Sequence, residues 1–167
     1  MLQIGIDPGL SGAIAFIRDG VVTHIVDMPI TAKVHGSGNM VDALALKDAI
    51  SWSAGLAGLI TEGIVNVHIE AVSAMPGQGV TSTFGFGHTA GVIEAVVACM
   101  KLPRWYWRPQ QWKKLAGISG KDKDAARTVA SRLYPEIASK LARKKDDGRA
   151  EAVLIAHYGQ LLAKGAN

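Results

Sequence analysis

The stretch Ile4–Phe16, "IGIDPGLSGAIAF", places one acid, Asp7, inside an otherwise apolar run. The segments on either side of this acid are typical of two buried strands joined by a glycine-rich turn. A carboxylate inside a dry sheet costs several kcal/mol unless its charge is compensated. Asp7 therefore either caps the "DPG" turn locally or holds a cation or a polar ligand.

The composition is that of an ordinary globular protein, with 167 residues, of which 49% are hydrophobic and 19% are charged. This length predicts a single domain over residues 1–167 with one hydrophobic core. One cysteine, Cys99, excludes an internal disulfide framework and fits a reducing compartment. No targeting segment and no apolar run of membrane-spanning length is present, so we expect a soluble, cytoplasmic protein.

The charges are separated along the chain. Residues 101–149 carry 14 Lys and Arg against 5 Asp and Glu, whereas residues 1–100 carry 3 against 8. This separation is expected if one segment faces a polyanion and the other gathers cations. A solvated basic surface would explain the first of these segments equally well.

The periodicity predicts a mixed sheet flanked by helices, an α/β fold. Strands are expected at residues 2–9, 11–20, 21–29, 65–72 and 104–109, and helices at 41–55, 91–101, 109–117, 121–135 and 147–164. Residues 31–40 form a predicted polar loop. A second predicted loop, residues 73–91, is rich in Gly, Ser and Thr, and such long loops are often functional.

Three further acids stand where burial or a neighbouring like charge would destabilise an ionised carboxylate. Glu70 lies near the end of the predicted strand 65–72, where it could also simply reach water. Asp147 and Glu151 are four apart, so on a helix they share one face, roughly 6 Å apart at Cβ. Capping explains Asp146 or Asp147 well, but it does not explain Glu151, which leads an apolar helical segment.

Together these acids would lie on an opening strand, a central strand and a final helix. Mg²⁺ takes oxygen ligands and is usually held by a few carboxylates. Two such ions about 4 Å apart can catalyse phosphodiester cleavage. The arrangement predicts a ribonuclease H-like fold with a mixed five-stranded sheet.

Four motifs resemble the RuvC family of Holliday-junction resolvases, and its bacteriophage-encoded members in particular. They are "IGIDPGLSGAIA", "IEAV" before a Gly- and Ser-rich loop, "RPQQWKKLAGISGKDKDAARTVA" and "DDGRAEAVLIAHYG". They occur in the family's order and cover most of the chain. The resemblance implies an endodeoxyribonuclease that resolves four-way DNA junctions by paired symmetric nicks, with 5′-phosphate products.

By this resemblance Asp7 and Glu70 match the first two catalytic, metal-binding carboxylates, and Glu151 matches the last. Asp147 is the best match to the remaining acid, with Asp146 as its rival, although the family commonly spaces the final pair three apart rather than four. The implied cofactor is Mg²⁺, two ions per active site, for which Mn²⁺ could substitute.

The resemblance also implies DNA contacts. Lys113 and Lys123 match basic residues that touch the junction, and Lys114 and Lys121 are neighbours that could share this role, since phosphate contacts dominate affinity for DNA. The side chain that enters the crossover point would come from the loop 73–91. Candidates there are Met75, Phe84 and Phe86.

Two symmetric cuts require two active sites, so the implied assembly is a two-fold homodimer. Its surface could include the apolar helix predicted at residues 91–101, although core packing explains that helix equally well.

Three alternatives stay open. A nuclease of the same chemistry could cut forks and flaps as readily as four-way junctions, and an inactive relative could bind junctions without cutting them. The motif around Asp7 also resembles the phosphate loop of actin-like kinases, but that superfamily needs two such domains, for which 167 residues are too few.

Overall fold

The computed structural model describes residues 1–54, 65–74, 77, 79–122 and 124–165. Its main sheet has five strands in the order β3-β2-β1-β6-β7. The antiparallel part consists of β1 (Leu2–Ile6), β2 (Ala13–Arg18) and β3 (Val21–Asp27), and β6 (Val65–Glu70) and β7 (Arg104–Trp107) continue it in parallel with β1. The predicted mixed five-stranded sheet is thus confirmed.

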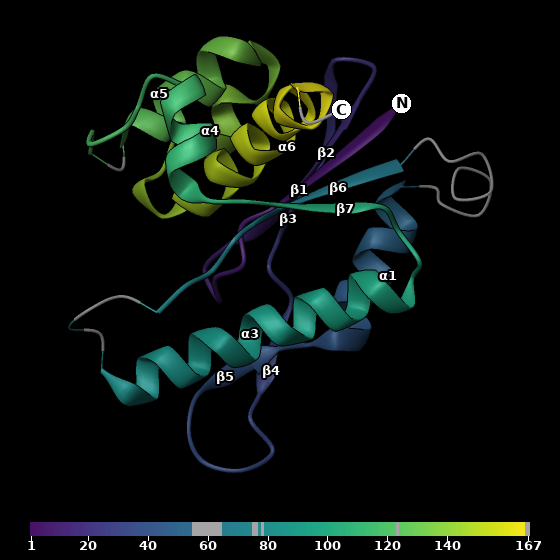
Figure 1. Ribbon diagram of the computed structural model, residues 1–167, viewed down its shortest axis with the longest axis vertical. Coiled ribbons are helices and arrows are strands. Elements are labelled where there is room, and N and C mark those ends of the chain that lie inside the picture. The colour runs from purple at the N-terminus through teal and green to yellow at the C-terminus, as the bar shows by residue number, and fades with distance from the viewer. Residues whose placement is uncertain (55–64, 75–76, 78, 123, 166–167) are drawn as a thin grey trace.

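Helices cover both faces of this sheet (Figure 1). On one face lie α4 (Pro109–Leu115), α5 (Asp124–Leu133) and α6 (Asp147–Gly165), with the short 3₁₀ turns η1 (Pro135–Leu141) and η2 (Lys144–Asp146). On the other lie α1 (Ala43–Ala54) and α3 (Val80–Cys99). Within the described part of the chain, no helix is both long and apolar enough to span a bilayer.

Strand alternation sorts large side chains from small ones. Ile4, Ile6 and Phe16 pack toward α1 and α3, whereas Ala13 and Ala15 belong to the core under α6. The α6 helix meets this side with small residues of its own, including the buried Ala150, Ala152 and Ala156. Small residues on both surfaces let the helix lie unusually close to the sheet.

The predicted loop at residues 31–40 is partly wrong, because a two-stranded hairpin forms there. Its strands are β4 (Ile30–Ala32) and β5 (Asn39–Val41), and the Lys33 N–H donates to the Gly38 carbonyl at 3.0 Å. Gly38 has a φ of 97°, which suits glycine. Strands this short carry too little alternation to be recognised in the sequence.

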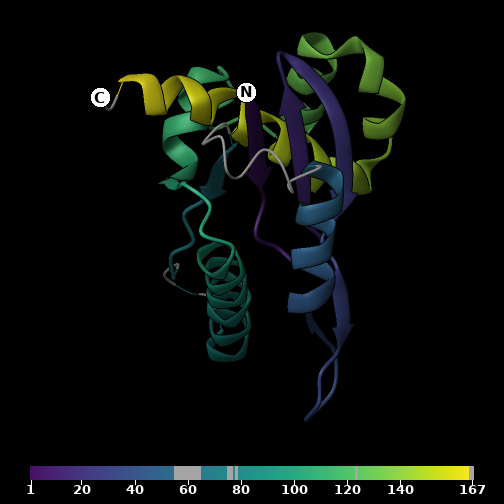
Figure 2. The same ribbon diagram turned by 90° about the vertical axis from the view of Figure 1, so that its right-hand side faces the viewer.

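The predicted loop 73–91 is also wrong over its second half, because α3 begins at Val80. Gly85, Gly87 and Gly91 favoured a loop, since each costs about 1 kcal/mol in a helix. One face of this helix nevertheless buries Thr89, Ile93 and Val97. Figure 2 shows the start of α3 and the β4–β5 hairpin both extending away from the sheet.

Gly5 provides a test of the close packing between α6 and β1. A Cβ at this position would lie 2.1 Å from the Ala152 carbonyl oxygen and 2.5 Å from the Ala156 nitrogen. Both atoms are backbone, so Gly5→Ala is expected to destabilise the fold by about 3 kcal/mol or more. Urea unfolding followed by far-UV circular dichroism measures this change.

Gly85→Ala is the matched control, because nothing lies within 4 Å of an added Cβ there. It should stabilise α3 by roughly 0.5–1 kcal/mol. Equal losses in the two variants would contradict the packing argument.

Candidate active site

Two of the acids meet at one edge of the sheet. Asp7 directly follows β1, and Glu70 is the last residue of β6. These parallel strands pair Ile6 with Ile69, so the next residues lie side by side. The Asp7 N–H donates to the Ala13 carbonyl at 3.0 Å, which closes the turn that carries the carboxylate.

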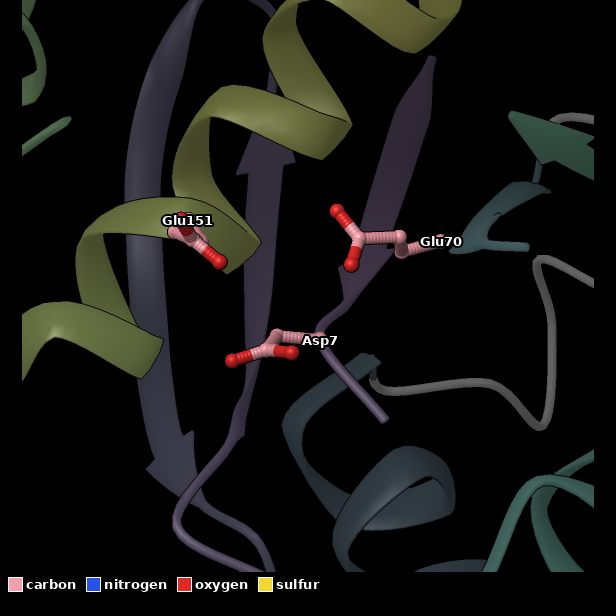
Figure 3. A group of neighbouring side chains, drawn as sticks. All are labelled: Asp7, Glu70 and Glu151. Atoms are coloured by element: carbon pink, nitrogen blue, oxygen red, sulfur yellow. The ribbon is translucent and has the colours of Figure 1, made fainter. Parts of the chain in front are cut away.

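Glu151 joins them from the first turns of α6. One turn earlier, Gly148 packs against the turn after β1, where an added Cβ would lie 2.5 Å from the Ser11 carbonyl oxygen and 3.1 Å from Asp7 Oδ2. A carboxylate oxygen from each of Asp7, Glu70 and Glu151 lies within 4.8 Å of the other two. Figure 3 shows the three carboxylates turned toward a common space, and we call them the acidic triad.

Among the described residues, Lys113 is the cation recorded beside the three carboxylates of the triad. Burial raises the pKa of Asp7 from 3.8 to about 8, with Glu151 and then Glu70 adding to the rise and Lys113 opposing it. Burial, followed by Glu151, also raises the pKa of Glu70. Clustered, partly buried carboxylates suit a hard divalent cation, which prefers oxygen ligands. The residues present therefore fit the metal that the sequence predicts.

Helix α4 contributes two neighbours of the triad. The Trp112 Nε1–H donates to Glu70 Oε2 at 2.9 Å, and Lys113 Nζ lies 3.0 Å from Glu151 Oε1. The same ammonium sits 4.9 Å from the centre of the Trp112 ring. Trp112 was not predicted as a site residue, although its position directly before Lys113 was a usable signal.

The acids at the start of α6 do not join the triad. Asp147 Oδ1 lies 2.9 Å from Arg127 Nε on α5. Asp146 is 2% exposed and accepts hydrogen bonds from Arg143, including one from its backbone N–H at 2.8 Å. These hydrogen bonds lower the Asp146 pKa. Asp146 thus acts as a cap, and Asp147 links α6 to α5.

The other residues predicted to contact DNA make no recorded contact with the triad within the described part of the chain. Lys114 and Lys121 are exposed, while Lys123 and Met75 lie outside the described residues. Phe84 is 75% exposed on α3 rather than in a loop. With Phe86 it lines a groove of about 690 Å³ between α3 and the β4–β5 hairpin.

Comparison with known proteins gives a structural match without a sequence match. No protein-family model and no curated protein matches the chain. Among solved structures, RuvC of T. thermophilus in complex with a Holliday junction substrate aligns over 99% of this chain and 96% of its own, at a TM-score of 0.57 and 16% identity. A second Thermus thermophilus RuvC structure aligns over 99% and 97%, at a TM-score of 0.55 and 12% identity. The chain therefore has a RuvC-like, ribonuclease H-like fold.

The raised pKa of Asp7 predicts a pH-dependent stability. Between about pH 4 and pH 8 the folded protein keeps a proton that the unfolded chain releases, so the free energy of unfolding falls as the pH rises. Asp7→Asn removes this loss. At about pH 9 the free energy of unfolding of Asp7→Asn should exceed that of the wild type by at least about 1 kcal/mol. This difference corresponds to a rise of roughly 2–4 °C in Tm.

The difference between the two proteins should vanish below about pH 3, where wild-type Asp7 is protonated in both the folded and the unfolded state. Mg²⁺ should raise the Tm of the wild type at high pH and leave that of Asp7→Asn nearly unchanged. Thermal unfolding across this pH range, with Mg²⁺ or EDTA, measures both effects. A pH-independent difference would contradict the assigned burial of Asp7.

Proposed function

We propose that the chain is a Mg²⁺-dependent, structure-selective endodeoxyribonuclease that resolves four-way DNA junctions. The observation that carries this proposal is the acidic triad, whose oxygens lie within 4.8 Å of one another at the edge of a ribonuclease H-like sheet. A solved structure with the same fold is a RuvC in complex with a Holliday junction substrate. The motifs around Asp7 and Glu151 support the same assignment.

In the proposed mechanism Asp7, Glu70 and Glu151 hold two Mg²⁺ ions, with Mn²⁺ as a possible substitute. When bound, such ions lower the pKa of water and stabilise charge on the leaving oxygen of a phosphodiester. The packing of α6 on β1 holds the partly buried carboxylates next to one another. Lys113, 3.0 Å from Glu151, supplies a cation for the scissile phosphate.

DNA would lie along the surface that carries the basic segment of residues 101–149. Lys114 and Lys121 are exposed there, and Lys123 is the fourth lysine that the motif assigns to this role. Phosphate contacts of this kind supply affinity rather than sequence selectivity. Phe84, whose ring is 75% exposed, would stack on a base opened at the branch point.

The proposed assembly is a homodimer formed through α3. Gly87, Gly91 and Ala95 are exposed at four-residue spacing on this mostly apolar helix. An apolar helix face left open to water favours association with a second apolar surface. A two-fold dimer would present two triads to opposite strands of a junction.

Cleavage of synthetic DNA tests the proposed activity. With Mg²⁺, the wild type should nick a four-way junction at paired sites and leave a linear duplex intact, and EDTA should abolish nicking. Asp7→Asn should cut at least about 100-fold more slowly, as expected when a metal ligand is altered, while it still binds the junction. Denaturing gels and mobility shifts with the same labelled substrates measure cutting and binding.

Asp147→Asn is the matched control variant, because the wild-type Asp147 carboxylate forms an ion pair with Arg127 and is not part of the triad. We expect it to slow cutting less than about 10-fold, below the range for changes at groups that support a metal site. A loss as large as that of Asp7→Asn would instead make Asp147 a fourth ligand. Equal cutting of forks and junctions would indicate a general branch nuclease, and tight binding without cutting would indicate an inactive binding module.

Gly91→Arg tests the dimer. Nothing lies within 4 Å of a Cβ added at Gly91, so the monomer should tolerate the change while a facing helix would not. Sedimentation should give twice the chain mass for the wild type and one chain mass for the variant. Ser139→Arg, exposed on η1 of the opposite layer, is the control and should remain dimeric. A Gly91→Arg protein that remains dimeric places the interface elsewhere.

A further inference from the structure

Trp112 makes a contact with the acidic triad that a merely structural tryptophan would not need. Its side chain is fully buried at 0% exposure, yet its single polar atom is directed at Glu70 Oε2, 2.9 Å away. An indole N–H donates but never accepts, does not ionise and cannot bind a cation. It can therefore orient a carboxylate without competing with the metal for it.

The backbone around Trp112 holds this contact in register. The last residues of β6 and β7, Glu70 and Trp107, are paired, and the Ala71 N–H donates to the Trp107 carbonyl at 2.9 Å. Helix α4 starts immediately afterwards, with Pro109 in its first turn and the Gln111 side chain accepting from the Arg108 N–H at 2.8 Å. Trp112 is thus carried on a rigid element fixed to the strand that bears its partner.

We propose that Trp112 is a positioning residue that fixes the Glu70 carboxylate for divalent metal binding. The inference rests on the proposed function, in which Glu70 is a metal ligand. Glu70 has two oxygens and several lone pairs, so one hydrogen bond at Oε2 leaves the carboxylate able to coordinate a cation. Groups that orient metal ligands in this way typically change metal affinity by about 10- to 100-fold when they are removed.

Trp112 also contacts Lys113, the cation that the chain itself supplies to the site. Lys113 Nζ lies 4.9 Å from the centre of the Trp112 ring and 3.0 Å from Glu151 Oε1. One residue thus holds Glu70 through its edge and borders Lys113 through its face. The ring contact survives replacement by phenylalanine, whereas the hydrogen bond does not, so the two contributions can be separated.

The test compares Trp112→Phe with Trp107→Phe. Trp107 is also buried, and its Nε1–H donates to His68 Nδ1 at 3.1 Å rather than to an acid. Both variants lose one indole N–H hydrogen bond and a similar volume, so their losses of stability without metal should be similar. Only Trp112→Phe should weaken metal binding, by about 10-fold or more.

Two measurements give this result independently of cleavage. Calorimetric titration of the protein with Mn²⁺ and the Mg²⁺-dependent rise in Tm both report metal affinity in the absence of DNA. In the cleavage assay, the Mg²⁺ concentration for half-maximal cutting should rise for Trp112→Phe, while junction binding in EDTA stays at the wild-type level.

Equal metal affinity in the two phenylalanine variants would overturn the inference and leave Trp112 as a core residue. That outcome differs from failure of the proposed function. If the wild type binds neither Mn²⁺ nor Mg²⁺, the metal site itself is wrong. If the wild type binds metal but cuts no DNA, the positioning role is still decided by the titrations.

Discussion

The close contact between α6 and β1 is the constraint on which the site depends. Gly5 has no side chain, and the backbone of Ala152 and Ala156 occupies the space that a Cβ would need. Three residues before Glu151, Gly148 makes a similar approach to the turn that follows Asp7. Together these two contacts fix the distance of α6 from the sheet and its position along its own axis. The carboxylate on α6 thereby meets the carboxylates at the ends of β1 and β6.

This packing has an electrostatic consequence, because it brings three partly buried acids within 4.8 Å of one another. Burial is the largest cause of the raised pKa of Asp7, and its two acidic neighbours add to it. Well-packed small residues thus maintain a cluster of like charges that would otherwise separate. The favourable free energy of packing offsets this repulsion until a cation reduces it. Asp7 thus opens a tight turn through its backbone N–H, while its carboxylate belongs to the triad.

Much of this arrangement could be predicted from local sequence, because strand alternation and helical spacing are short-range signals. The strand before Asp7, the strand that ends at Glu70 and the helix of Glu151 were assigned in this way. The start of α3 and the β4–β5 hairpin were not, since their contacts with the rest of the fold override weak local preferences. The spacing of Asp147 and Glu151 correctly put both on one helix. It could not reveal that Arg127, from a different helix, forms an ion pair with Asp147.

The identity of the neighbouring cations separates structural acids from the triad. Asp27, Asp146 and Asp147 each form an ion pair with an arginine, whose planar guanidinium carries five N–H donors in a fixed arrangement. The ion pair at the triad is made instead by Lys113, whose ammonium is a compact point charge on a flexible chain. Such a group can leave Glu151 when a divalent cation arrives and turn to a phosphate. An arginine in the same place would compete with the metal for Glu151. A lysine therefore suits a site in which a divalent cation replaces the ammonium beside Glu151.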